Sequence, residues 1–156
     1  MQIHLIAIGT KMPSWVNEAY EDYAKRLPAD FSLKLIEIPA EKRNKNADIP
    51  RILEREGEKM WAAIPKNSHV IALDMKGKSY STENFAKRLE QLQQQTPIIC
   101  FLIGGPEGFA PCYLEKTHEK QSLSSFTLPH PLVRIILAEQ VYRAWSVLKN
   151  HPYHRA

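Results

Sequence analysis

Apolar and polar residues along this chain change period several times, and each change predicts a change of secondary structure. Short apolar runs bounded by glycine, proline or polar turns predict strands at residues 3–8, 31–38, 69–73 and 98–103. Apolar residues at helical spacing predict helices at residues 14–27, 48–63, 82–92 and 132–149. A weaker alternation predicts a fifth strand at residues 122–128, and residues 74–79 read as a turn. This order predicts an α/β fold, with a mostly parallel sheet and helices on both faces.

The glycine-rich segment after the strand at residues 98–103 is the first candidate for a ligand site. Gly104 and Gly105 end the strand, and glycine permits a sharp turn and close approach of a ligand to the main chain. Pro106 and Glu107 suit the first turn of a short following helix. The Gly-Lys-Ser/Thr and G-x-G-x-x-G spacings of the usual phosphate and dinucleotide sites are missing. A tight strand-to-helix connection without a ligand explains the glycines equally well.

A second stiffened segment precedes the longest predicted helix. Pro129 and Pro131 flank His130, so the chain leaves the predicted fifth strand in an extended conformation before the helix begins. The helix at residues 132–149 is apolar around most of its circumference. Such a surface indicates burial on more than one side, either within a single domain or against a second subunit.

The predicted strand ends suggest where a ligand would bind. In sheets of this kind, ligands bind beyond the carboxyl ends of the strands. Three such ends fall at residues 73–74, 104–105 and 128–130. We therefore expect one pocket to be built from all three.

The composition fits one globular domain over residues 1–156. With 44% hydrophobic and 24% charged residues, the chain is expected to bury a sizeable core and not to be disordered. The net charge of +4 and the sequence pI of about 9.1 allow an RNA or DNA partner without requiring one. Cys100 and Cys112 match no disulfide framework or zinc motif, and no signal peptide or transmembrane run is evident. We expect a soluble, cytoplasmic protein.

A basic loop and the C-terminal tail hold the remaining candidate residues. Lys42, Arg43 and Lys45 could contact phosphates, although a plain solvated surface also explains them. The tail at residues 151–155, His-Pro-Tyr-His-Arg, has residue types that can stack on a base, contact phosphate and move a proton. Its two histidines have no acidic or Cys partner at ligand spacing, so no metal is expected.

Several segments form a set of motifs that covers the chain nearly end to end. They are Gly-Thr-Lys-Met-Pro at residues 9–13, Ile-Pro-Ala-Glu-Lys-Arg at 38–43, Leu-Ile-Gly-Gly-Pro-Glu-Gly at 102–108, Leu-Pro-His-Pro-Leu-Val-Arg at 128–134, Tyr-Arg-Ala-Trp at 142–145 after Glu139, and the tail. With these motifs in this order, the chain closely resembles the RlmH family, which consists of bacterial ribosomal RNA methyltransferases of the SPOUT class.

The resemblance implies a fold and an activity that the patterns alone do not give. RlmH-like proteins are homodimers whose C-terminal part is threaded into a deep trefoil knot. They use S-adenosylmethionine to methylate N3 of a pseudouridine in the 23S rRNA of the assembled ribosome. The methyl group of a sulfonium is already activated, so such an enzyme needs alignment, desolvation and removal of the N3 proton instead of a metal.

The resemblance also implies roles for individual residues. Cofactor contacts, made largely through backbone groups, fall on Leu73, Gly104, Gly105, Leu123, Ser124, Ser125, Phe126, Thr127 and Leu128. The expected RNA contacts are Lys42, Arg43, Lys45, Arg134 and Tyr142. In the tail, His154 is a candidate base, Arg155 a candidate anion stabiliser and Tyr153 a residue that positions the base, all expected to act in the partner subunit's cofactor site.

Three other functions compete with this interpretation. A non-enzymatic ribosome-binding module would keep the basic loop but would not need a glycine turn beside a proline-stiffened loop. A hydrolase that uses the histidines would depend on a metal. A SPOUT methyltransferase acting on another RNA, such as tRNA, would share every motif, because nothing in the sequence reads a base directly.

Overall fold

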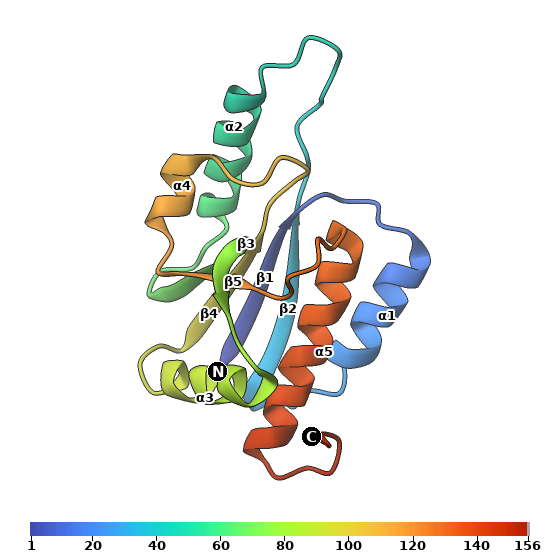
Figure 1. Cartoon of the computed structure of the whole chain (residues 1–156), viewed down its shortest axis with the longest axis vertical. Helices are drawn as coiled ribbons and strands as arrows, with labels where there is room; N and C mark the ends of the chain where they lie inside the picture. Colours follow the sequence, from blue (N-terminus) through green and yellow to red (C-terminus); the bar gives the residue numbers. More distant parts are fainter. Residues whose placement is uncertain (156) are drawn as a thin grey trace.

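The computed structural model describes residues 1–155, which form one five-stranded sheet with helices on both faces (Figure 1). The strand order is β2-β1-β4-β3-β5, and every neighbouring pair is parallel, which confirms the predicted parallel α/β architecture. The strands are β1 (Gln2–Ile8), β2 (Ser32–Ile38), β3 (Ser68–Ser79), β4 (Ile98–Ile103) and β5 (Glu119–Ser122). The helices are α1 (Ser14–Ala24), α2 (Ile49–Ala62), α3 (Thr82–Gln93), α4 (Pro111–Lys116) and α5 (His130–Leu148), with a 3-10 turn, η1 (Ala29–Phe31).

The two central strands divide their apolar side chains between two cores. In β1, Ile3 and Leu5 belong to the core that includes α1, α3 and α5, whereas Ile6 and Ile8 belong to the core that includes α2. β4 repeats this alternation, because successive side chains of a strand point to opposite faces. A strand buried on both faces loses the apolar-polar alternation of a surface strand, which explains the continuous apolar runs in the sequence.

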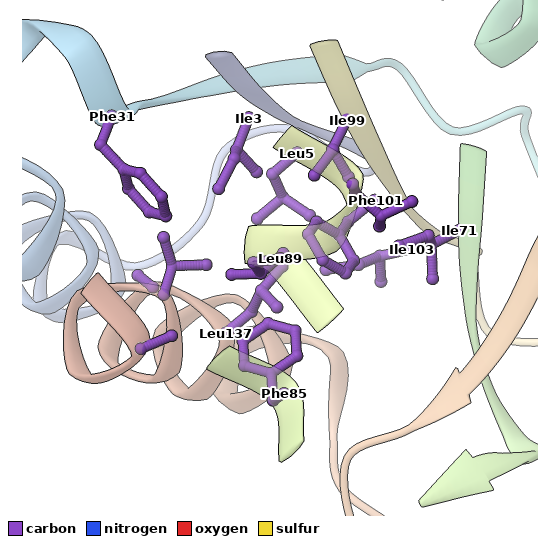
Figure 2. Packing of buried hydrophobic residues seen from close by; sticks show 14 of the residues in the cluster. Ile3, Leu5, Phe31, Ile71, Phe85, Leu89, Ile99, Phe101, Ile103 and Leu137 are labelled. Atoms are coloured by element: carbon purple, nitrogen blue, oxygen red, sulfur yellow. The ribbon is translucent and has the colours of Figure 1, made fainter. Parts of the chain in front are cut away.

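The larger core fixes α3 and α5 against the sheet. Figure 2 shows Phe85 and Leu89 of α3 and Leu137 of α5 next to Leu5 and Phe101 of the central strands. Leu5, Leu89, Phe101 and Leu137 are fully buried, and each such side chain contributes about 1.5–3 kcal/mol by leaving water. α5 packs against both α1 and α3, so much of its wide apolar surface is covered within one chain.

Helix boundaries follow local chemistry that is visible in the sequence. The Asp48 side chain accepts a hydrogen bond from the Arg51 amide, and Ser81 does the same for the Asn84 amide, so both residues act as N-caps. Pro131 lies in the first turn of α5, where its missing amide hydrogen is not needed. Within residues 1–155, no helix combines the length and apolarity required to cross a membrane.

The predicted turn at residues 74–79 is wrong, because β3 continues to Ser79. Leu73 and Lys78 both pair with Gln121 of β5, so the residues between them form a bulge inside the strand. A Cβ atom at Gly77 would lie 2.5 Å from the backbone nitrogen of Gln121, so only glycine fits this close approach. The apolar pattern ends at Leu73 because backbone pairing, and not burial, holds the rest of the strand.

Two further predictions near the glycine segment need correction. Pro106 and Glu107 do not begin a helix; they lie in a turn closed by a bridge between Gly105 and Gly108, and α4 begins only at Pro111. The fifth strand is β5, at Glu119–Ser122, and not the predicted residues 122–128; residues 123–129 form the loop that leads to α5. Strand β5 is short and polar on an edge of the sheet, so it has no apolar alternation to reveal it.

Replacing Gly77 by alanine should lower the free energy of unfolding by about 1–3 kcal/mol, because the new methyl group forces the backbones of β3 and β5 apart. Urea denaturation of Gly77→Ala and wild type measures the loss. Lys76→Ala is the matched control, since Lys76 is exposed in the same bulge and should unfold like wild type. Equal stability of Gly77→Ala and the control would contradict the close approach.

Candidate active site

A cavity of about 610 Å³ lies beyond the carboxyl ends of β4 and β5 and beside the bulge of β3, the strand between them. β3 contributes Leu73 to Met75, β4 contributes Ile103 with the following Gly104 and Gly105, and β5 contributes Gln121 and Ser122. The loop after β5 and the first residues of α5 close the cavity. All three segments predicted to form one pocket therefore line the same cavity.

Backbone forms one wall of the cavity at the turn after β4. A Cβ atom at Gly104 would lie 2.7 Å from the carbonyl oxygen of Gly108, so the turn has no room for a side chain there. The Gly108 amide donates to the Gly105 carbonyl oxygen at 3.0 Å, and Gly108 has a φ of +81° that favours glycine. This wall offers main-chain groups to a ligand without intervening side chains.

The loop at residues 123–129 forms another wall and is held by short local hydrogen bonds. The Ser122 hydroxyl donates to the Ser124 carbonyl oxygen at 2.9 Å, and the Ser124 hydroxyl accepts from the Phe126 amide at 2.9 Å. Phe126 lines the cavity and yet is 81% exposed, so its ring stands at the mouth. Of the nine predicted cofactor contacts, Ser125 and Thr127 do not line the cavity, and the other seven do.

His130 and Arg134 connect the cavity to the carboxyl ends of β1 and β2, at the same edge of the sheet. Arg134 is fully buried; it donates from Nε to His130 Nε2 at 2.9 Å, from Nη1 to Glu37 at 2.7 Å and from Nη2 to the Gly9 carbonyl oxygen at 2.8 Å. Burial, with the nearby charge of Arg134, lowers the pKa of His130 to about 4. His130, which lines the cavity, is therefore a neutral imidazole that accepts a hydrogen bond through Nε2.

Arg43 holds the glycine turn from outside the cavity. Its guanidinium pairs with Glu56 at 2.8 Å and with Glu107 of the turn at 2.8 Å, and both carboxylates raise its pKa above the usual value. Glu56 is 2% exposed, and a Cβ atom at Gly105 would lie 3.0 Å from Arg43 Nη2. Arg43 thus links the loop after β2, helix α2 and the turn after β4.

The structure separates the predicted RNA contacts into two groups. Lys42 and Lys45 are exposed on the loop after β2. Arg43 is engaged by two carboxylates, Tyr142 is 7% exposed and Arg134 is fully buried, so these three side chains are used inside the chain. The predicted RNA contact by Arg134 is therefore corrected: its guanidinium is an internal cation that joins the segment after β1, the end of β2 and the start of α5.

The tail folds back on its own chain and does not line the cavity. The Tyr153 hydroxyl donates to Glu139 at 3.1 Å, and His154 Nε2 lies 3.0 Å from Glu83 of α3. Burial and the Glu139 hydrogen bond raise the pKa of Tyr153 to about 12, so its hydroxyl stays protonated. Glu139, which holds the tail, lies more than two turns along α5 from His130 at the cavity, a separation of about 14 Å at 1.5 Å per residue. The tail is therefore held away from the cavity. Arg155 is exposed.

A family model described as "Predicted SPOUT methyltransferase" matches residues 1–154. The chain belongs to the SPOUT methyltransferase family. The fold is similar to that of a probable methylase family protein from Haemophilus influenzae Rd KW20, with a TM-score of 0.57 and 12% identity over 99% of this chain and 70% of that chain. At this identity the likeness concerns the fold alone.

Membership of the SPOUT family implies an RNA methyltransferase, and SPOUT methyltransferases generally use S-adenosylmethionine. The sequence interpretation missed several residues that line the cavity of this SPOUT methyltransferase: Met75, Phe109, Gln121, Ser122 and Val133. Gln121 and Ser122 are not predicted to line the cavity because the sequence pattern places the carboxyl end of the fifth strand at residue 128 and not at residue 122. Within residues 1–155, no three His, Cys, Asp or Glu side chains are grouped to hold a metal ion.

Because the pKa of His130 is low, we expect the free energy of unfolding to depend on pH in mildly acidic solution. An unfolded histidine has a pKa near 6.5, whereas folded His130 takes up a proton only near pH 4. Between these values the unfolded state binds one proton more, so the free energy of unfolding falls as the pH decreases from 6.5 to 4. His130→Gln keeps an acceptor for Arg134 and removes the titration, so its stability should fall less steeply. Urea unfolding at several pH values tests this, and parallel curves would contradict it.

Proposed function

We propose that this chain is an S-adenosylmethionine-dependent methyltransferase that methylates N3 of a pseudouridine in 23S rRNA of the assembled ribosome. The family supports an RNA methyltransferase, and the motifs that resemble RlmH support the finer substrate. The observation that carries the proposal is the cavity shared by the carboxyl ends of β4 and β5 and the bulge of β3, walled by backbone on one side.

The cavity fits the proposed cofactor in size and chemistry. Its volume of about 610 Å³ lies in the range of small-molecule sites, which is about 300–1,000 Å³. Leu73, Leu123 and Leu128 supply apolar surface, and the side-chain-free wall at Gly104 leaves main-chain groups to recognise polar edges of a ligand. These residues would hold the cofactor, with Ser124 and the backbone at Gly105 nearby.

The cofactor supplies a methyl group on a positively charged sulfur, which makes that carbon ready for attack by a nucleophile. The protein would therefore have to align the target nitrogen, exclude water and let a base take the imide proton as the N–CH₃ bond forms and the S–CH₃ bond breaks, which would leave a neutral thioether. Phe126, exposed at the mouth, is positioned to cover an incoming base by stacking. Neutral His130 keeps an uncharged imidazole in the wall, which does not repel a cationic sulfur.

A second copy of the chain completes the site in this proposal. In one chain, His154 and Arg155 do not line the cavity, so a base in the tail would act in the cavity of the other protomer. We also propose that the chain forms a homodimer and contains the deep trefoil knot expected for RlmH-like proteins. A tail that is held by Glu139 and Glu83 in one chain would have to release these contacts to reach RNA in another.

Cofactor binding should depend on the turn after β4. Gly104→Ala brings a methyl group within 2.7 Å of the Gly108 carbonyl oxygen, so the wall must shift. We expect S-adenosylmethionine to bind at least about tenfold more weakly, which corresponds to ~1.4 kcal/mol. Titration calorimetry measures this, and Ser125→Ala is the control because Ser125 adjoins the cavity without lining it. No heat with wild type would favour a ribosome-binding module without catalysis.

Methyl transfer should depend on the tail while cofactor binding does not. His154→Ala and Arg155→Ala should each lower the rate of methyl incorporation by about 10²–10⁴-fold if they move a proton or stabilise the anion. Mass spectrometry of ribosomes, free subunits, naked 23S rRNA and tRNA after incubation with protein and cofactor locates the modified nucleotide. Unchanged rates in both variants would exclude a catalytic tail, and a methylated tRNA would replace the proposed substrate.

A further inference from the structure

A second hollow, of about 560 Å³, lies between α3 and the outer edge of the sheet. It is lined by the last residues of β3, by the exposed side of α3 and by the start of β5. Its walls are polar, and cationic side chains come from all three elements: Lys78, Lys87, Arg88 and Lys120. We call this hollow the basic groove.

The charges in the basic groove do not cancel. Among the described residues, Glu119 is the one carboxylate that lines it, and Glu119 accepts from Arg88 Nε at 2.8 Å and from His69 Nε2 at 2.9 Å. Arg88 and Glu119 therefore neutralise each other. Among residues 1–155, no carboxylate forms an ion pair with Lys78, Lys87 or Lys120.

The three lysines keep their ammonium groups free for an anion. Lys87 and Lys120 are exposed, and the Lys78 ammonium lies 4.9 Å from the centre of the Tyr80 ring, a weak contact at an exposed site. Asn84 and Gln91 add amide donors to the same walls. Three like charges around one hollow repel one another unless an anion lies between them, so the groove favours a polyanion.

The basic groove adjoins the candidate active site through one residue. Gln121 pairs with Leu73, which lines the cavity, and also with Lys78, which lines the groove. Gln121 itself lines the cavity, and the preceding Lys120 lines the groove. A strand of RNA whose target base enters the cavity would therefore have neighbouring phosphates next to the groove.

We propose that the basic groove binds backbone phosphates of the RNA substrate beside the nucleotide that is methylated, with Lys78, Lys87 and Lys120 as the phosphate contacts. The inference rests on the proposed RNA methyltransferase activity. Phosphate contacts of this kind fix the register of an RNA and carry no sequence information. The groove thus supplies affinity and position, and the cavity supplies the chemistry.

A pair of charge reversals tests the groove. Lys87→Glu with Lys120→Glu removes two phosphate contacts, and Lys34→Glu with Lys66→Glu is the matched control because both lysines are exposed and lie outside the groove. Binding of a fluorescently labelled single-stranded RNA is measured by anisotropy between 0.05 and 0.3 M salt. About 0.7 ions are released for each phosphate contact to a single strand, so two lost contacts should reduce the slope of log K against log salt concentration by about 1.4. Binding at 0.1 M salt should then be about 25-fold weaker.

The outcomes separate the groove from the proposed activity. The proposed role of the groove would be overturned if the groove variant bound RNA as tightly as wild type. It would also be overturned if the control variant lost as much RNA affinity as the groove variant. The groove variant should bind S-adenosylmethionine like wild type, because none of its changed residues lines the cavity. If wild type binds RNA through the groove but transfers no methyl group, the groove stands and the methyltransferase proposal fails. Loss of polyglutamate binding with unchanged RNA binding would assign the groove to an acidic protein and overturn the proposal.

Discussion

The buried guanidinium of Arg134 is the interaction on which the arrangement of this molecule depends most. It joins the segment after β1 through Gly9, the end of β2 through Glu37 and the start of α5 through His130. Removing the partner of a buried charge lowers the free energy of unfolding by about 3–5 kcal/mol, so separation of these elements is strongly unfavourable. Because α5 begins at the cavity, the same contacts also hold one wall of the candidate active site in place.

The opposite side of the sheet has a similar anchor in Arg43. Its pairs with buried Glu56 and with Glu107 fix the turn after β4, whose glycines leave the backbone bare. Both arginines would be expected on the surface from the sequence alone. Both instead hold loops in place through internal hydrogen bonds and ion pairs. Backbone walls can recognise a ligand only if such loops stay in position, since catalysis by alignment tolerates little displacement.

Two neighbouring surfaces of the molecule carry the two proposed functions. The cavity has the volume and the bare main chain suited to a cofactor, whereas the basic groove has unpaired ammonium groups suited to a polyanion. Gln121 of β5 lines the cavity and pairs with Lys78 of the groove, because the bulge in β3 brings Leu73 and Lys78 to the same partner. A short polar edge strand that contributes nothing to the apolar core therefore decides how the two surfaces are related.

The sequence by itself determined the elements whose side chains leave water or cap a helix. The apolar runs of β1 and β4 predicted two strands buried on both faces, Asp48 and Ser81 predicted two helix starts, and the strand ends predicted one shared pocket. Only the tertiary structure decided that β3 continues past Asp74, that β5 is at Glu119–Ser122, and that Arg43 and Arg134 serve the interior. Burial leaves a local apolar pattern in the sequence, whereas backbone pairing between distant strands and ion pairs between distant loops leave none.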